Sequence, residues 1–332
     1  MKILFAYRTE EERMYIAEKL AEHEIIFIKG ALHESEWDGA GIECVSIFVT
    51  SHISREELDR LPNLKLITTR STGYDHIDLP LARERGITVA TVPTYGEHTV
   101  SEFAFALLLM LSRNLFPARE RVIKEGSFSS EGLTGFDLFG KTLGVLGTGR
   151  IGKNTIRIAR SFAMNILAFD AHPDSAFAQE MNFSYTSLDE ILTKSDIISL
   201  HLPELSETQH IINHDAIAKM KKGMVIVNTA RGMLIDTKAL VWGLQENIIS
   251  AVGLDVLSEE GYVADELRLI DKAHPNEKSL RTLLFNHYLI DHPRVIITPH
   301  MAFNTKEALE RILDTTIQNI KSFMKGKPIN CV

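Results

Sequence analysis

Residues 142–152 read TLGVLGTGRIG, and this stretch decides the fold class of the chain. Its first part, 142–146, is short and apolar, which is typical of a buried strand, and a helix is expected over 153–163. Between them, Gly147-Thr148-Gly149-Arg150-Ile151-Gly152 fits the pattern G-x-G-x-x-G. The first glycine of this pattern permits a tight turn, the second lets a pyrophosphate approach the backbone, and the third lets helix and strand pack closely. The segment therefore predicts a strand–turn–helix unit that binds a dinucleotide.

An acidic residue ends the next predicted strand. Asp170 follows the apolar run 165–169 and lies 18 residues after Gly152. A carboxylate at this place can accept hydrogen bonds from the ribose hydroxyls of adenosine, and it repels a 2′-phosphate. We therefore expect NAD rather than NADP as the cofactor. The alternative, a glycine turn in an unrelated α/β protein, is disfavoured because strand, helix and acid occur together.

Outward from this motif, short apolar runs alternate with segments of helical period in both directions. Strands are expected over 3–7, 25–28, 45–49, 64–68 and 87–90 before the motif, and over 165–169, 197–201, 224–228, 251–254 and 295–298 after it. Helices are expected over 10–22 (with Met14, Ala17, Leu20 and Ala21 on one face), 99–112 and 305–325. Repeated β-α-β alternation predicts parallel sheets covered by helices, an α/β fold. At 332 residues the chain exceeds one usual core, so two domains are expected.

Composition excludes several classes of protein. Lys and Arg number 36 against 44 Asp and Glu, a formal charge of −8, so neither nucleic acid nor an anionic membrane is expected as a partner. The longest apolar run, 103–111, is far shorter than the roughly 20 residues that span a bilayer. With only Cys44 and Cys331, we expect a reducing compartment and a cytoplasmic protein. No clustered Cys/His spacing occurs, so no metal is expected.

Three groups of polar residues follow predicted strands downstream of the motif. They are Asn228-Thr229-Ala230-Arg231-Gly232, Gly253-Leu254-Asp255-Val256 with Glu259 and Glu260 after it, and Ile297-Thr298-Pro299-His300. In open parallel sheets, ligands bind beyond the carboxyl ends of the strands. We therefore expect an arginine, a glutamate and a histidine to converge on one crevice.

These three residue types suit hydride transfer between a nicotinamide and a carbonyl carbon. A histidine can protonate the carbonyl oxygen near neutral pH, and a neighbouring carboxylate stabilises its imidazolium form. An arginine offers a planar fork to a substrate carboxylate. Taken singly, Arg231 could be a surface ion-pair partner, Glu259 and Glu260 a solvated turn, and His300 a structural histidine; their joint placement beside a nucleotide motif favours function. His201, at a strand end, is expected to line the cofactor crevice.

With these motifs in this order, the chain resembles the D-isomer-specific 2-hydroxyacid dehydrogenases, and within them the D-lactate dehydrogenase branch. The segments 70–78 (RSTGYDHID), 92–95 (VPTY) and 299–305 (PHMAFNT) also look like that branch. The resemblance covers essentially the whole chain. It implies an NAD-dependent oxidoreductase that reduces pyruvate, or a related 2-oxo acid, to the D-2-hydroxy acid.

The resemblance also implies roles for catalytic residues. Arg231 would bind and orient the substrate, and His300 would donate the proton in reduction. The glutamate that pairs with the histidine falls five residues after the motif aspartate in the family, which selects Glu260 over Glu259. Because the segment between Glu260 and His300 is longer than in many relatives, Glu259, Asp265 and Glu266 stay alternatives as the carboxylate partner.

The remaining site residues are likewise implied by the resemblance. Backbone N–H groups of Thr72 and Gly73 would hold the substrate carboxylate, with Tyr95 nearby. Asp255 would face the nicotinamide carboxamide. The NAD site would comprise Gly147, Gly149, Arg150, Ile151, Gly152, Asp170, His201, Leu202, Pro203, Thr208, Thr229, Ala230 and Asp255.

The resemblance further implies a domain arrangement and an assembly. A flavodoxin-like substrate domain would comprise residues 1–98 plus 301–332, and a Rossmann NAD-binding domain residues 99–300. A homodimer is expected, with the helix over 99–112 and the glycine-rich segment 126–140 at its interface.

Other functions compete with this one. Within the family, they are the reduction of glyoxylate, hydroxypyruvate or phenylpyruvate and the oxidation of 3-phosphoglycerate. From a different class, a catalytically idle NAD(H)-sensing corepressor is possible, although an intact Arg–Glu–His set argues against it. A flavodoxin-like binding module would leave the second half of the chain without a role.

Overall fold

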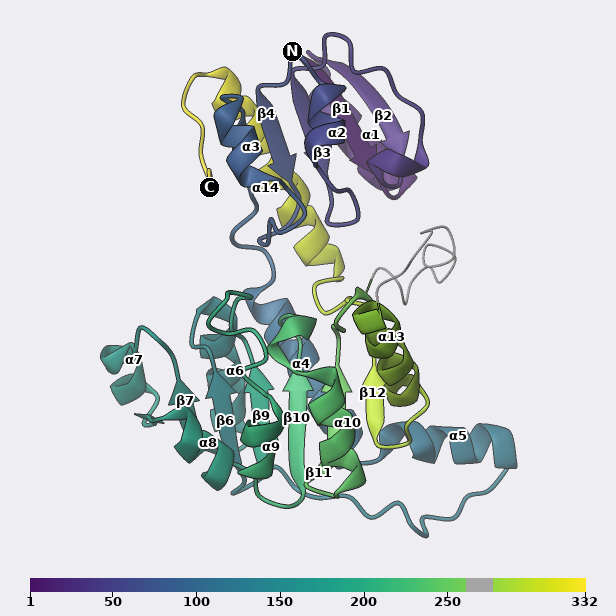
Figure 1. Cartoon of the computed structure of the whole chain (residues 1–332), viewed down its shortest axis with the longest axis vertical. Coiled ribbons are helices and arrows are strands. Elements are labelled where there is room, and N and C mark those ends of the chain that lie inside the picture. Colours follow the sequence, from purple (N-terminus) through teal and green to yellow (C-terminus); the bar gives the residue numbers. More distant parts are fainter. Residues whose placement is uncertain (261–276) are drawn as a thin grey trace. The chain divides into compact units, whose positions relative to one another are not determined.

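The computed structural model describes residues 1–260 and 277–332, and the chain divides into two compact units. Unit 1 comprises Met1–Tyr95 and Asn304–Val332, and unit 2 comprises Gly96–Phe303. The chain thus begins in one unit, passes through the other and returns for its last helix (Figure 1). The boundaries expected from the sequence, 98/99 and 300/301, lie three residues from those of the two units.

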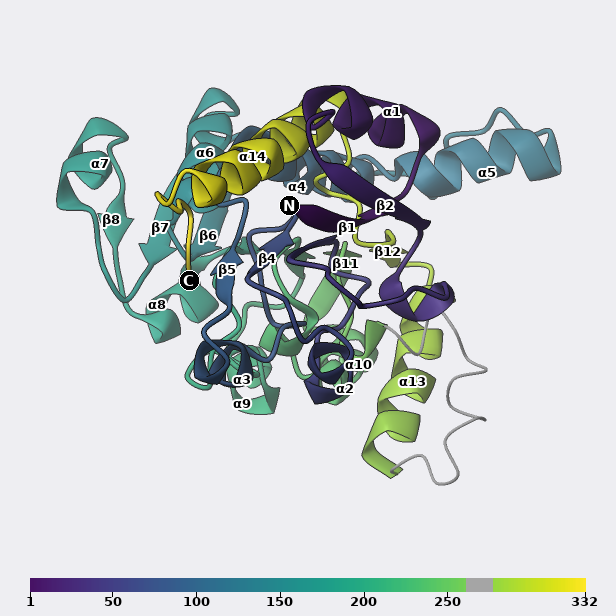
Figure 2. The same cartoon turned by 90° about the horizontal axis from the view of Figure 1, so that it is seen from above.

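Unit 1 is built on a five-stranded parallel sheet with the order β2-β1-β3-β4-β5. The strands are β1 (Lys2–Tyr7), β2 (Glu24–Lys29), β3 (Cys44–Ile47), β4 (Leu66–Thr69) and β5 (Thr88–Ala90). Helices α1 (Glu10–Lys19) and α14 (Lys306–Met324) pack on one face, and α2 (Arg55–Asp59) and α3 (Leu79–Glu84) pack on the other (Figure 2). A short 3-10 turn, η1 (Leu32–Glu34), follows β2.

Unit 2 is built on a seven-stranded parallel sheet with the order β12-β11-β10-β9-β6-β7-β8. The strands are β6 (Thr142–Leu146), β7 (Asn165–Phe169), β8 (Ser184–Tyr185), β9 (Ile197–Leu200), β10 (Met224–Asn228), β11 (Ile249–Leu254) and β12 (Val295–Ile297). Successive strands run outward from β6 to β8, and the chain then returns to place β9 on the other side of β6. The strand order therefore reverses between β6 and β9, the place where open α/β sheets bind ligands.

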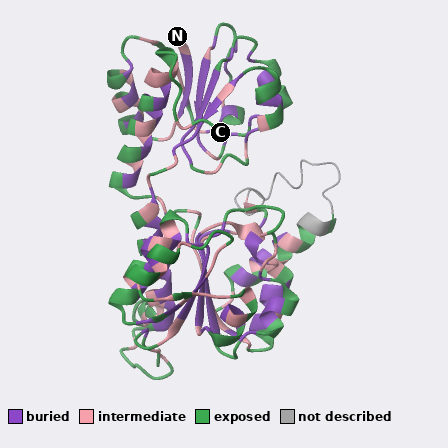
Figure 3. Cartoon of the chain, turned by 90° about the vertical axis from the view of Figure 1, so that its left-hand side faces the viewer, coloured by how far each residue is buried: buried purple, intermediate pink, exposed green. Residues whose placement is uncertain are grey.

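Helices cover both faces of the unit 2 sheet. One face carries α4 (Glu97–Ser112), α6 (Arg150–Ser161) and α7 (Ser175–Glu180). The other carries α8 (Leu188–Lys194), α9 (His214–Ala218), α10 (Thr237–Gln245) and α13 (Glu277–Ile290). The strands are buried between these layers and the helices expose their outer faces (Figure 3). The predicted α/β class with parallel sheets is confirmed.

Some elements differ from those expected. Helix α6 begins at Arg150 rather than at residue 153, because the backbone turns helical directly after Gly149 and takes Gly152 into the first turn. Helix α5 (Leu115–Glu125), which the sequence did not predict, has no buried residue and projects from unit 2 (Figure 1). No single described helix is long and apolar enough to cross a bilayer. Helices α4 and α5 together meet the length and composition of a membrane span, but they are bent by 60° at the break between them.

Candidate active site

The glycine-rich turn joins β6 to α6 and leaves room for a ligand. Gly147 has a φ of +94°, and a Cβ there would lie 2.7 Å from the carbonyl carbon of His201. A Cβ on Gly152 would overlap the carbonyl oxygen of Gly147. A Cβ on Gly149, in contrast, would meet no atom within 4 Å. Only glycine therefore fits at two positions, and the third opens the backbone at the N-terminus of α6, where phosphate groups bind favourably.

Asp170 lies directly after β7, beside this turn. Its Oδ2 accepts hydrogen bonds from the backbone N–H of Thr148 at 2.6 Å and from the Thr148 hydroxyl at 3.0 Å. Its Oδ1 accepts one from the His172 backbone N–H at 2.8 Å. Burial acts to raise the pKa of Asp170, but these hydrogen bonds outweigh it and hold the pKa below its ordinary value. Asp170 thus presents a fixed negative charge beside the glycine turn.

The other predicted cofactor residues also follow strands of this sheet. His201, Leu202 and Pro203 come after β9, Thr229 and Ala230 after β10, and Asp255 after β11. The Thr208 hydroxyl donates to the Pro203 carbonyl at 2.6 Å, which folds the loop back on itself. With Gly149 open and Asp170 ionised, this edge of the sheet fits a dinucleotide.

His201 is held as a neutral histidine. Its Nε2 lies 2.9 Å from the Ser199 hydroxyl, and burial lowers the pKa of His201 to about 4. A histidine with so low a pKa carries no proton to give near neutral pH. The structure thus agrees with a lining role for His201 and not with acid–base work.

Arg231 lies at the end of a turn that Asn228 closes. Asn228 Oδ1 accepts from the Ala230 N–H at 3.0 Å, and Asn228 Nδ2 donates to the Arg231 carbonyl at 2.8 Å. This fixes the chain between β10 and η2 (Gly232–Leu234). The Arg231 guanidinium donates to the Ala230 carbonyl at 2.8 Å.

His300 lies on a turn that Asp255 holds in place. The Asp255 side chain is buried; its Oδ1 accepts from the Thr298 hydroxyl at 2.6 Å and the Met301 N–H at 2.9 Å, and its Oδ2 accepts from the Ala302 N–H at 2.8 Å. His300 itself has a φ of +49°, in the left-handed region that a non-glycine residue rarely adopts. Asp255 therefore stabilises an unfavourable backbone conformation that sets the direction of the imidazole.

Sequence reasoning missed this role of Asp255. Two of its partners are backbone N–H groups, which any residue supplies, so no sequence signal marks them. Both carboxylate oxygens are engaged by the turn, and the expected contact with a nicotinamide carboxamide stays a prediction.

Glu260 and His300 form a hydrogen-bonded pair across two loops. Glu260 Oε2 lies 2.9 Å from His300 Nδ1, and Glu260 Oε1 accepts from the Leu257 N–H at 3.1 Å. Burial acts to lower the pKa of His300, but the hydrogen bond and charge of Glu260, together with the charge of Asp255, outweigh it and raise that pKa above its ordinary value; Arg231 opposes them. The alternative partners Asp265 and Glu266 lie outside the described residues.

The predicted substrate residues Thr72, Gly73 and Tyr95 belong to unit 1. Two side-chain hydrogen bonds hold the loop after β4: the Ser71 hydroxyl donates to the Gly73 carbonyl at 2.6 Å, and the Thr72 hydroxyl donates to the Val92 carbonyl at 2.9 Å. The Tyr95 carbonyl accepts from Arg311 at 2.9 Å. The structure describes these residues within their own unit, and their contacts with substrate stay predictions.

Below this loop lies a buried ion pair that the sequence did not suggest. Arg70, 1% exposed, pairs with Glu12 of α1 and donates to the Ala6 carbonyl, and its guanidinium lies 4.8 Å from the ring centre of Phe5. Because Arg70 immediately precedes Ser71 and Thr72, this pair fixes the start of the predicted carboxylate-binding loop.

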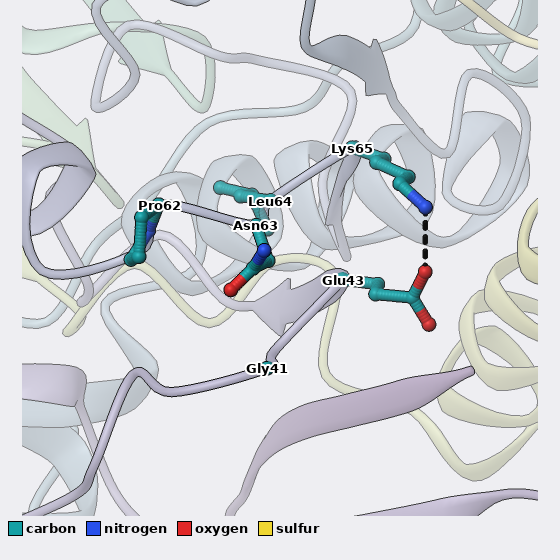
Figure 4. Close-up of a pocket in the computed structure, with 6 residues that line it drawn as sticks. All are labelled: Gly41, Glu43, Pro62, Asn63, Leu64 and Lys65. Atoms are coloured by element: carbon teal, nitrogen blue, oxygen red, sulfur yellow. Dashed lines mark hydrogen bonds and ion pairs between the residues drawn. The ribbon is translucent and has the colours of Figure 1, made fainter.

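A hollow of about 460 Å³ in unit 1 lies elsewhere (Figure 4). Gly41, Glu43 and Lys65 lie along it, before the amino ends of β3 and β4, and Lys65 Nζ lies 2.7 Å from Glu43 Oε1. None of the predicted site residues lines it. Within residues 1–260 and 277–332, no three His, Cys, Asp or Glu side chains are grouped to hold a metal ion.

Comparison with known proteins gives consistent matches. Residues 105–302 match the family model described as D-isomer specific 2-hydroxyacid dehydrogenase, NAD binding domain. A D-lactate dehydrogenase of Escherichia coli is 40% identical over 291 residues, which cover 86% of this chain and 85% of that protein. A hydroxypyruvate reductase of Blautia hydrogenotrophica is 37% identical over 284 residues, which cover 84% of this chain and 81% of that protein.

A solved structure matches over almost the whole chain. The D-lactate dehydrogenase of Aquifex aeolicus, in complex with NAD and lactic acid, superposes with a TM-score of 0.87 at 35% identity. The match covers 98% of this chain and 96% of that one.

Proposed function

Because this chain belongs to the D-isomer-specific 2-hydroxyacid dehydrogenase family, we propose that it is a D-lactate dehydrogenase, which reduces pyruvate to D-lactate. Family membership makes it an NAD-dependent oxidoreductase acting on D-2-hydroxy acids, as expected from the sequence. The choice of pyruvate over other 2-oxo acids is the part we propose.

One observation above all supports this activity: the 2.9 Å contact between Glu260 and His300. This contact raises the pKa of His300 and so favours the protonated form that a proton donor needs, and Arg231, whose guanidinium can bind a carboxylate, is close enough to act on the same pKa. An NAD(H)-sensing corepressor without catalysis would need neither the paired acid nor the strained backbone of His300.

The proposed mechanism assigns one task to each side chain. When bound, NADH supplies a hydride to the carbonyl carbon of the 2-oxo acid. Arg231 binds the substrate carboxylate and orients the carbonyl through its planar guanidinium. Since Nδ1 of His300 faces Glu260, Nε2 is the atom that donates the proton to the carbonyl oxygen. Glu260 stabilises the imidazolium before transfer, and the neutral histidine accepts the proton back in lactate oxidation.

Two relatives support the choice of lactate, and one supports an alternative. The Escherichia coli and Aquifex aeolicus proteins are D-lactate dehydrogenases, whereas the Blautia hydrogenotrophica protein is a hydroxypyruvate reductase. These substrates share the 2-oxo acid group and differ in the substituent on the carbonyl carbon. Arg231 and His300 act on the shared group, so they do not separate the two activities.

The test is a panel of 2-oxo acids at a fixed, saturating NADH concentration. We expect kcat/KM to be highest with pyruvate and lower with glyoxylate, hydroxypyruvate and phenylpyruvate. Chiral chromatography should show that the product has the D configuration. A higher kcat/KM with hydroxypyruvate would replace the proposed substrate, and the absence of any NADH oxidation would favour the corepressor.

We also propose that the chain forms a homodimer in a cytoplasmic, reducing compartment. Helix α5 and the segment after it expose large apolar side chains, among them Ile123 at 61%, Phe128 at 96% and Phe139 at 77%. Covering them with a second copy would remove apolar surface from water. Cys44 and Cys331 are free thiols, which supports the reducing compartment. Light scattering should give twice the chain mass, and Ile123→Glu should reduce it, whereas Met14→Glu, on the exposed face of α1, should not.

A further inference from the structure

Helix α13 carries a wholly buried asparagine that contacts the loop of Glu260. Asn286 is 0% exposed, and its Nδ2 donates to the Ser258 carbonyl at 2.7 Å, across 28 residues of sequence. Ser258 lies two residues before Glu260. Figure 1 shows α13 beside β12, which leads to His300. The asparagine thus links a helix of the core to the loop that carries the carboxylate.

The same loop also packs closely against the turn that carries Arg231. A Cβ on Gly232 would overlap the carbonyl group of Leu257 and crowd the Ser258 nitrogen. Gly232 directly follows Arg231. The loop is therefore contacted both by the turn that carries Arg231 and by the amide of Asn286.

The position of this loop determines whether Glu260 reaches His300. From Ser258 the backbone passes through Glu259, which has a φ of +61°, and Glu260 Oε1 then accepts from the Leu257 N–H at 3.1 Å. Glu260 Oε2 lies 2.9 Å from His300 Nδ1. A hydrogen bond depends steeply on distance and angle, so a small displacement of Ser258 would weaken this contact.

A buried asparagine is energetically unfavourable at such a position. Its neighbours on α13, Leu283 and Leu289, are buried and apolar. Among the described residues, Asn286 Oδ1 and Ser258 Oγ are buried polar atoms without a hydrogen-bond partner. Burying such atoms costs free energy that an apolar side chain would not. The one described hydrogen bond of the Asn286 side chain is the one to Ser258.

We propose that Asn286 is a positioning residue, whose hydrogen bond to the Ser258 carbonyl holds Glu260 within reach of His300. This inference rests on the proposed roles of Glu260 and His300 in proton transfer. Asn286 acts through the loop and touches neither Glu260 nor His300 in the described contacts.

The expected signature is a change in pH dependence. The groups that act on the His300 imidazole are Glu260 and Asp255, which raise its pKa, and Arg231, which lowers it, as does burial. Loss of the Asn286 anchor weakens only the contribution of Glu260. The pKa of His300 should then fall, and with it the upper pKa in the profile of kcat/KM for reduction, because reduction needs the protonated histidine.

The test compares Asn286→Leu with Glu260→Gln in pyruvate reduction across pH. We expect Asn286→Leu to lower the upper pKa toward the Glu260→Gln value and to reduce kcat/KM at alkaline pH by roughly tenfold, the size of one lost buried hydrogen bond. The KM for NADH should stay unchanged. In a Glu260→Gln background, Asn286→Leu should cause no further shift.

A matched control separates positioning from stability. Leu283→Ala, on the same helix, should lower the unfolding midpoint and leave the upper pKa where it is. If Asn286→Leu does not fold, Asn286→Ala removes the donor without adding bulk and takes its place. A folded Asn286 variant with the wild-type profile, while Glu260→Gln shifts it, overturns the inference alone. An unshifted profile in Glu260→Gln contradicts the proposed role of Glu260, and the inference with it.

Discussion

Glu260 Oε2 and His300 Nδ1 lie 2.9 Å apart although 40 residues separate them in the sequence. The two side chains come from different loops, one after β11 and one after β12. Because these strands are parallel neighbours, their carboxyl ends, where the two loops begin, lie at the same edge of the sheet. Asp255 fixes the second loop, and Gly232 packs against the first. The pair is thus positioned by the fold from both sides.

Cofactor choice is the first prediction. The ionised Asp170 should repel a 2′-phosphate, so kcat/KM should be far higher with NADH than with NADPH. Asp170→Ser should bring kcat/KM with NADPH closer to kcat/KM with NADH, because it removes the charge that repels the 2′-phosphate. The measurement is pyruvate reduction with each cofactor under the same conditions. Equal kcat/KM values for the wild-type protein would contradict the assignment of Asp170.

Removal of the proton donor is the second prediction. His300→Ala should reduce kcat for reduction by at least ~10², the usual contribution of a general acid. NADH affinity, followed by fluorescence titration, should change little. His214→Ala, at the start of α9, is the matched control and should keep its turnover. A His300→Ala variant that retains most of its activity would mean that water or another group delivers the proton.

Substrate orientation by Arg231 is the third prediction. Lysine keeps the charge but loses the planar fork, so Arg231→Lys should raise KM for pyruvate and lower kcat together. Arg113→Lys, on an exposed residue after α4, should leave both constants as they are. Unchanged constants in Arg231→Lys would make the residue a surface ion-pair partner.

The buried ion pair of unit 1 gives a prediction for stability. Glu12→Gln leaves the Arg70 guanidinium buried without a charge partner, which should destabilise unit 1 by about 3 kcal/mol. Glu11→Gln, on the exposed side of α1, should cost little. Trp37 lies in unit 1 and Trp242 in unit 2, so urea unfolding in a Trp242→Phe background follows unit 1 through Trp37. Equal unfolding midpoints for the two variants would show that the pair adds nothing.

The sequence predicted those features that repeat or that stand at strand ends. Strands over 165–169 and 224–228 were located to the residue, because each is a short, mainly apolar run; β10 is buried along its whole length, and β7 buries alternate residues. The glycine motif and the strand-end residues Arg231 and His300 followed from the topology of parallel sheets. What each residue does at the site was implied by the family resemblance and stays a prediction.

Features that depend on distant partners could not be predicted. The expected apolar face of the first helix contained Met14, yet Met14 is 58% exposed, and Glu12 is buried instead because Arg70, directly after β4, pairs with it. Helix α5 has no buried residue, so the position of its apolar side chains could not be related to a core of unit 2. Asn286 contacts Ser258 across 28 residues of sequence, and neither residue type marks such a pair in the sequence.

The pH profile of pyruvate reduction tests the central claim, that Glu260 keeps His300 protonated as the acid. Glu260→Gln keeps the shape and removes the charge, so the pKa of His300 should fall. The upper pKa of kcat/KM should drop by on the order of one unit, with the loss greatest at alkaline pH and partly recovered at acid pH. Glu259→Gln is the matched control and should leave the profile unchanged. A shift in Glu259→Gln but not in Glu260→Gln would contradict the account.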